Sequence, residues 1–227
     1  MKAHIKRNAM PTTWRIKRKQ VRFVMRPFPG SSFQFGIPMV VAMRDILHKG
    51  KSAKEVKTIL LNNDVTVNGK KVKEIKYLIG LMDVLSIPKT KELFRLLINK
   101  KGELKLVDIP ESEAGIFIGK IIKKNLVQGK CQLGVHTGRN ILTDQKESYK
   151  IGDSIVFDKN KINDHLKLEV GSLVYLTGGK HIGYIASIKE IKNKTIICES
   201  DKNSFSVVKK DVFVVGKDDK TRISLLK

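Results

Sequence analysis

The spacing of apolar residues between positions 37 and 60 predicts two consecutive helices. Pro38 suits a first helical position, and Gly50 ends a stretch whose apolar residues share one helical face: Val40, Met43, Ile46 and Leu47. Ser52 followed by Glu55 is a capping-box signature for a second helix, which has an apolar stripe at Ala53, Val56, Ile59 and Leu60.

The segment DVTVNGKKVKEI, at 64–75, predicts a β-hairpin. Asn68-Gly69 lies between alternating apolar positions, and this dipeptide is the strongest short-range hairpin signal. The order helix, helix, hairpin is therefore expected before Pro88.

Beyond Pro88 the apolar runs shorten and predict strands separated by turns. The first group indicates a central β domain, with strands at 93–98, 104–109, 116–122, 131–135 and 154–157. The second group fits a small closed barrel, with strands at 172–177, 183–191, 195–199, 205–209 and 212–215. A frayed tail is expected to begin at Lys217 to Lys220. The fold class is therefore α+β and multidomain.

The first 44 residues contain no acidic residue. Ten cations stand before Asp45: Lys2, Lys6, Arg7, Arg15, Lys17, Arg18, Lys19, Arg22, Arg26 and Arg44. A segment so uniformly charged, with little apolar periodicity, is expected to order only against phosphates. Its aromatic residues, Trp14, Phe23 and Phe28, either stack on bases or anchor the arm to its own domain. The alternative is a plain solvated tail.

Composition extends this basic character to the whole chain of 227 residues. Lys and Arg number 45 against 22 Asp and Glu, a formal charge of +23, which predicts a polyanionic partner. No apolar run approaches the roughly 20 residues that span a bilayer, and no secretory signal is apparent, so we expect a cytoplasmic protein without membrane contact. Cys131 and Cys198 lack metal-ligand spacing and are expected to be buried thiols, with no metal site.

Two glycine-containing stretches resemble nucleotide-binding motifs, but neither fits one. LTGGKHIGYIASI, at 176–188, is glycine-rich but continues as a strand, whereas a phosphate-binding Walker loop opens a helix. Gly50-Lys51-Ser52 matches the end of the Walker motif, but position 45 is Asp where the motif has Gly, and the segment before it is predicted to be a helix. Four aspartates fit turn and cap positions better than catalysis: Asp144, Asp153, Asp158 and Asp164. No enzyme activity and no cofactor are expected.

Two loops have the chemistry to contact a nucleic acid. In the first, Gly178, Gly179 and Gly183 permit positive φ and close approach, and Lys180 and His181 lie at the tip. The alternative is a plain hairpin tip. In the second, HTGRN at 136–140, a tight turn presents His136, Arg139 and Asn140, with a purely structural turn as the equal alternative.

Several stretches together resemble the S-four-e family of small-subunit ribosomal proteins of archaea and eukaryotes. They are HIKRNAMPTTWRIKRK at 4–19, GLMDVLSIPKT at 80–90, HTGRNIL at 136–142, YKIGDSI at 149–155 and GSLVYLTGGKHIGYIASI at 171–188. Thr137 departs from the family, in which an aspartate is expected, and the compact length resembles archaeal members.

The resemblance implies four parts: a basic N-terminal extension at 1–37, a helix-helix-hairpin RNA-binding domain of the S-four type (alpha-L) at 38–98, a central β domain at 99–168, and a KOW-type SH3-like barrel with a short tail at 169–227. It implies a structural role, with small-subunit rRNA and neighbouring ribosomal proteins as partners and no catalysis. A small-molecule substrate and a homo-oligomer are not expected. The KOW glycines correspond to Gly178, Gly179 and Gly183, and the alpha-L RNA face to Lys51, Ser52, Lys54, Lys57, Asn68 and Lys70, which Lys71 adjoins.

Two other classes remain open. An RNA-modifying enzyme can have an alpha-L domain, although the central segment is small for a catalytic domain. A regulatory binding module is the second alternative, since KOW barrels also occur in transcription elongation factors.

Overall fold

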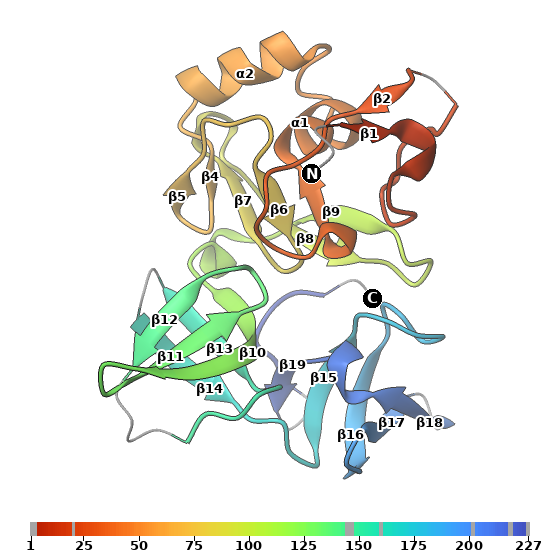
Figure 1. Cartoon of the computed structure of the whole chain (residues 1–227), viewed down its shortest axis with the longest axis vertical. Coiled ribbons are helices and arrows are strands. Elements are labelled where there is room, and N and C mark those ends of the chain that lie inside the picture. The colour runs from red at the N-terminus through yellow and green to blue at the C-terminus, as the bar shows by residue number, and fades with distance from the viewer. Residues whose placement is uncertain are drawn as a thin grey trace. The chain divides into compact units, whose positions relative to one another are not determined.

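The computed structural model describes residues 4–19, 21–143, 148–158, 161–200, 203–217 and 220–225. The chain forms two compact units (Figure 1). The first comprises Met1–Ile98 and Glu103–Gly115, and the second comprises Asn99–Gly102 and Ile116–Lys227. Both are built mainly from antiparallel β-strands, and the helices described belong to the first unit, apart from single turns.

The first predicted helix is shorter and wider than expected. Helix α1 (Met39–Val41) passes directly into a π-helical turn, η3 (Ala42–Ile46), in which the Leu47 amide donates to the Ala42 carbonyl at 2.9 Å. The left-handed residue after it is His48, with φ of +53°, and not the expected Gly50. Val40 and Met43 are buried as predicted, whereas the wider turn leaves Ile46 half-buried.

The second helix, α2 (Ala53–Asn62), begins as predicted. The Ser52 hydroxyl accepts from the Glu55 amide at 3.2 Å, and the Glu55 carboxylate accepts from the Ser52 amide at 3.4 Å, which completes a capping box. Val56 and Leu60 supply its buried face.

The first unit contains a five-stranded sheet in the order β5-β4-β7-β8-β9. Its strands are β4 (Thr66–Val67), β5 (Lys70–Lys71), β7 (Val84–Ile87), β8 (Glu92–Ile98) and β9 (Leu104–Asp108). Asn68 and Gly69 have φ of +48° and +72°, so the predicted hairpin has a left-handed two-residue turn. Two smaller ladders pair β1 (Ile5–Lys6) with β2 (Phe23–Val24) and β3 (Gly36–Pro38) with β6 (Leu78–Gly80).

Strand β9 changes the predicted domain boundary. It pairs with β8 from Phe94↔Asp108 to Ile98↔Leu104, so residues 103–115 belong to the first unit. The boundary expected between positions 98 and 99 falls inside a hairpin, because the Lys101-Gly102 turn connects paired strands instead of separating domains.

The second unit contains two antiparallel sheets (Figure 1). The five-stranded sheet runs β12-β11-β10-β13-β14, with β10 (Phe117–Val127), β11 (Lys130–Val135), β12 (Asn140–Thr143), β13 (Ser154–Asp158) and β14 (Lys161–Leu166). The six-stranded sheet runs β18-β17-β16-β15-β19-β20, with β15 (Ser172–Leu176), β16 (Ile185–Ile191), β17 (Thr195–Ser200), β18 (Asn203–Val208), β19 (Val212–Lys217) and β20 (Lys220–Thr221). Sequence patterns had indicated neither β12 nor β14.

The C-terminal segment differs from the expected frayed tail. Strand β20 pairs with β19 through Gly216↔Thr221 and Lys217↔Lys220, and Ile223 is buried. Short 3₁₀ turns lie at η1 (Arg7–Ala9), η2 (Phe33–Phe35), η4 (Pro88–Thr90), η5 (Glu111–Glu113) and η6 (Lys209–Asp211). The predicted strands of this region are confirmed, and closure of a barrel stays a prediction.

A half-buried lysine connects the two sheets of the second unit. Lys120, on β10, donates through Nζ to the carbonyls of Lys210 and Val212, each at 2.7 Å, and of Lys209 at 3.3 Å. Burial lowers the pKa of this amine to about 8, and the Lys209 charge lowers it further while that of Asp211 opposes the shift.

Candidate nucleic-acid interface

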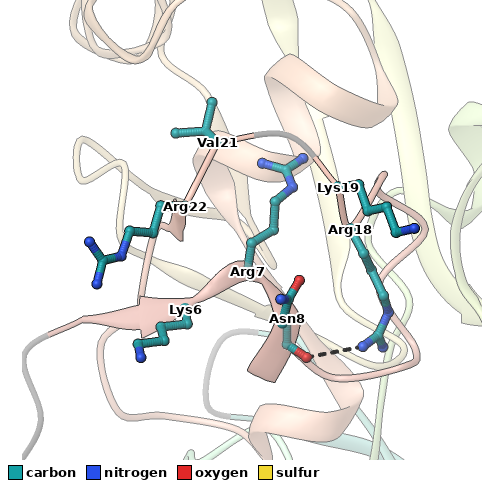
Figure 2. Close-up of a pocket in the computed structure, with 7 residues that line it drawn as sticks. All are labelled: Lys6, Arg7, Asn8, Arg18, Lys19, Val21 and Arg22. Carbon is teal, nitrogen blue, oxygen red and sulfur yellow. Dashed lines mark hydrogen bonds between the residues drawn. The ribbon is translucent and has the colours of Figure 1, made fainter.

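The basic arm encloses a hollow of about 400 Å³, shown in Figure 2. Its seven lining residues include five cations and no carboxylate: Lys6, Arg7, Asn8, Arg18, Lys19, Val21 and Arg22. We call this group the arm cradle. Such a concentration of positive charge favours an anionic ligand, because bound negative charge offsets the repulsion between the cations.

Arg7 supports the cradle from inside. It is buried, its Nε donates to the Lys17 carbonyl, and its amide donates to the Arg22 carbonyl at 2.9 Å. Figure 2 shows its side chain rising between the segments that carry Arg22 and Lys19. The expectation that Arg7 contacts RNA directly is therefore corrected: it connects the beginning of the arm to residues 17 and 22.

Trp14 anchors the arm to the first unit. The indole is 3% exposed, its Nε1 donates to the Gly36 carbonyl at 2.8 Å, and its ring lies 5.4 Å from that of Phe33. The prediction that Trp14 stacks on RNA bases is wrong, because the ring is buried in the protein's own core. The alternative reading, an anchoring role, agrees with the structure.

Further contacts order the arm without phosphates, contrary to the sequence-based expectation. The Leu104 amide donates to the Thr13 carbonyl at 2.8 Å, and the Thr13 hydroxyl donates to the Gln34 carbonyl at 2.7 Å. Met10 and Val24 are also buried. Apolar periodicity did not predict these contacts, because each contacting residue of the arm stands alone among cations and forms no repeating pattern.

The remaining arm cations mostly face solvent. Lys6, Arg15, Lys17, Arg18, Lys19 and Arg22 are exposed, and Arg26 is half-buried. Arg18 donates to the Asn8 carbonyl at 3.2 Å, and the Arg22 guanidinium lies 5.3 Å from the Phe23 ring centroid. These contacts orient the cations while leaving them accessible to a ligand.

The expected RNA face around α2 is present only in part. Lys51, Lys54, Lys57 and Lys70 are exposed. Asn68 is corrected, because it is buried with its amide bonded to Asp83 at 2.6 Å, whereas Ser52 is exposed and its hydroxyl accepts the bond that caps α2. Lys71 forms an ion pair with Asp64, and Arg44 forms one with Asp45 at 2.9 Å.

The HTGRN turn joins β11 to β12 and is built mainly for structure. Gly138 has φ of +82°, and the Val135 amide donates to the Arg139 carbonyl at 2.9 Å. His136 accepts through Nδ1 from the Lys120 amide at 3.1 Å and packs edge-on against Phe213, while Arg139 lies 5.9 Å from the Phe157 ring centroid. Of the three side chains predicted to contact RNA, His136 and Arg139 are half-buried and Asn140 is exposed, so His136 is corrected to a packing residue.

The three glycines of the loop after β15 have different roles. Gly183 is buried, and a Cβ on it would lie 2.5 Å from the Asn99 carbonyl carbon. Gly183 therefore allows close packing, and the prediction that it contacts RNA is corrected. Gly178 makes room for the Asp211 carboxyl group. Gly179 has φ of +78°, and a Cβ on it would meet no atom within 4 Å. With Lys180 it forms the exposed tip of the loop.

One exposed basic segment went unnoticed in the sequence. Residues 114–143 contain five cations and no acidic residue. Within them, every residue from Ile122 to Lys130 is exposed on the hairpin of β10 and β11. The absence of acidic residues over this stretch is the signal that could have identified it.

Acidic and sulfur-containing residues take structural positions. Asp153 accepts from the Lys150 and Leu168 amides, each at 3.0 Å, as the turn interpretation predicts, and Asp144 lies outside the described residues. Both cysteines are buried and free, and burial raises the pKa of the Cys198 thiol to about 11. Among the residues that the structure describes, no group of three or more His, Cys, Asp or Glu could hold a metal ion. None of the helices described is long and apolar enough to span a membrane.

Fold and surface together define a mostly β-sheet protein with few helices and an exposed, strongly basic arm. A model of the ribosomal family S4e matches residues 90–163. The small ribosomal subunit protein eS4 of Methanosphaera stadtmanae is 38% identical, with 98% of this chain and 95% of that protein covered. The eS4 protein of Methanocella arvoryzae is 37% identical, with 95% and 94% covered.

A solved structure agrees with these relatives. The crystal structure of the 30S ribosomal protein S4e from Thermoplasma acidophilum aligns with a TM-score of 0.70 at 31% identity, covering 82% of this chain and 97% of that one. The chain belongs to the S4e family of ribosomal proteins, as the resemblance in its motifs predicted.

Proposed function

We propose that the protein is a structural constituent of the small ribosomal subunit that binds and stabilises folded small-subunit rRNA. In this role it acts in the cytoplasm beside neighbouring ribosomal proteins, contributes to subunit assembly and translation, and catalyses no reaction. The observation that carries the proposal is the arm cradle, in which four exposed cations without a carboxylate are held in place by an arm that the buried Arg7 and Trp14 support: Lys6, Arg18, Lys19 and Arg22.

The mechanism is electrostatic docking followed by recognition of RNA shape. Each cation that meets a phosphate releases condensed counterions, so affinity falls with salt by a slope of about −0.7 to −0.9 per contact. Arg7 and Trp14 hold the exposed cations in a fixed arrangement before RNA arrives. This preorganisation lowers the ordering cost that a disordered tail bears at binding.

Two further surfaces extend the proposed interface. The exposed lysines on α2, just before it and on β5 form the RNA face of an alpha-L type domain over residues 38–98, namely Lys51, Lys54, Lys57 and Lys70. The six-stranded sheet over residues 169–227 is a KOW-type module whose exposed tip is Gly179 and Lys180. In this role the backbone and side chains of both units bind RNA and take no part in a chemical reaction.

Sedimentation of native cell extract tests this function. A constituent of the small subunit travels with the small ribosomal particle in stoichiometric amount and remains there in moderate salt. An RNA-modifying enzyme or an elongation factor instead remains mainly near the top of the gradient. Recovery of most of the protein away from ribosomal particles would reject the proposal.

A further inference from the structure

A second hollow, of about 520 Å³, lies within the second unit. It is formed by the loop 178–181, by residues 204–208 on β18, and by Asp211 in the turn η6. Its volume is within the range of about 300–1,000 Å³ typical of small-ligand sites. It differs from the arm cradle in having both aromatic rings and a carboxylate.

Two stacked rings line this hollow. His181 and Phe205 lie 4.0 Å apart between centroids with planes inclined by 19°, and Tyr184 meets His181 edge-on at 6.0 Å. His181 and Phe205 are both half-exposed. Unstacked nucleobases in single-stranded RNA sites stack on partly exposed flat rings of this kind.

Asp211 is an unusual lining residue for a protein of formal charge +23, because a carboxylate repels phosphate. The structure holds it firmly in place. Its carbonyl accepts from the Thr177 amide at 2.8 Å and hydroxyl at 3.0 Å, and a Cβ at position 178 would lie 2.7 Å from its Cγ. Gly178 is therefore required for the carboxyl group to occupy this position.

We propose that this hollow binds one unstacked guanine base of the RNA, an inference that rests on the proposed function. The base extends the His181–Phe205 stack, and the two Asp211 carboxylate oxygens accept from guanine N1–H and the N2 amino group. Lys180, exposed at the loop tip, contacts the adjoining phosphate. Among the four bases only guanine presents two adjacent donors on its Watson–Crick edge, so a carboxylate there selects it.

The test uses the full-length protein and fluorescently labelled oligouridine strands that carry one central guanine, inosine or adenine, with binding followed by anisotropy. Guanine is expected to bind about tenfold or more tightly than adenine, as loss of a bidentate contact implies. Inosine lacks the N2 amino group and should fall between them. This comparison needs no mutation and so cannot be confused with misfolding.

Variants then assign the preference to the hollow. Asp211→Asn should reduce the preference for guanine over adenine to about twofold or less, because an amide offers one acceptor in place of two. Glu190→Gln makes the same charge change at an exposed site outside the hollow and should leave the preference intact. His181→Ala should weaken binding of all three strands by a similar factor.

The outcomes separate this inference from the proposed function. Equal, salt-sensitive binding of all three strands overturns the guanine site and leaves RNA binding standing. Failure to bind these strands and folded rRNA alike overturns the proposed function itself. Competition by free guanosine monophosphate at concentrations comparable with those of the guanine strand would assign the hollow to a nucleotide and reject its role in RNA recognition.

Discussion

Asn68 Nδ2 donates to Asp83 Oδ1 at 2.6 Å, although the two residues are fifteen positions apart in the chain. Both side chains are buried. Asn68 Oδ1 accepts from the Val84 amide at 2.8 Å, and Asp83 Oδ2 accepts from the Gly80 amide at 2.7 Å. The hairpin turn of β4 and β5 is thereby fixed to the turn before β7, which positions the exposed Lys70.

Replacing Asn68 with alanine should lower the free energy of unfolding by about 1–3 kcal/mol, because Asp83 and the Val84 amide lose a buried partner. Urea denaturation measures this effect. Asn68→Gly is the matched control, since glycine tolerates the φ of +48° but also lacks the amide. The alanine variant should be less stable than the glycine variant, and wild-type stability in both would contradict the role given to this pair.

Trp14 is the only tryptophan in the chain, so its fluorescence reports on the arm. Because the indole is buried against Phe33, its emission should change little when RNA binds. Titration with folded rRNA measures this directly. Strong quenching on saturation would instead indicate base stacking and contradict the anchoring role.

Trp14→Ala should destabilise the first unit by about 3–5 kcal/mol and weaken RNA binding, because the arm loses its anchor. Trp14→Phe keeps most of the packing and loses the bond to the Gly36 carbonyl, so it should fall between alanine and wild type. Equilibrium unfolding and RNA binding should rank the three proteins in the same order.

Lys120 gives the second unit a characteristic pH dependence. Burial lowers its pKa in the folded protein to about 8 from 10.5, so between these values the unfolded chain binds more protons. The contribution of Lys120 to stability therefore rises with pH across that window. The difference in unfolding free energy between wild type and Lys120→Met should shift in favour of wild type from about pH 8 to pH 10. A difference that stays constant with pH would contradict this account.

Gly179 and Gly183 share a φ of +78° but differ in their surroundings. Alanine at 179 should cost about 1–2 kcal/mol of stability, since only backbone strain is added. Alanine at 183 should cost clearly more, because its Cβ would lie 2.5 Å from the Asn99 carbonyl carbon. Thermal unfolding of the two variants measures the difference, and equal losses would contradict the packing role of Gly183.

Local patterns in the sequence predicted what depends on near neighbours. The capping box at Ser52 and Glu55 and the Asn68-Gly69 hairpin formed as expected because their partners lie within a few residues. The π-helical turn after Val41 was not predictable, since it depends on how Ala42 to Ile46 pack. The assignment of 103–115 to the first unit depends on the pairing of β9 with β8, which a run of short apolar segments does not specify.

The residues of the candidate site were likewise predicted only where local sequence determines them. Net charge and the acid-free arm identified exposed cations such as Lys17 and Lys19. Charge could not show that Arg7 is buried, or that Trp14 fills a core position 22 residues from its hydrogen-bond partner. Phe205 and Asp211 line the second hollow because strand pairing brings them to the loop at 178–181, and no local motif marks them.

The salt dependence of binding to folded small-subunit rRNA tests the central claim most directly. Wild type is compared with a variant in which Lys17, Arg18 and Lys19 are changed to glutamate. The control carries the same charge change at three exposed lysines outside the proposed interface: Lys105, Lys167 and Lys194. The account predicts a steep slope of log affinity against log salt for wild type, a slope shallower by about 2–3 for the arm variant, and unchanged thermal stability. Arm-variant binding equal to that of the control at physiological salt would contradict it.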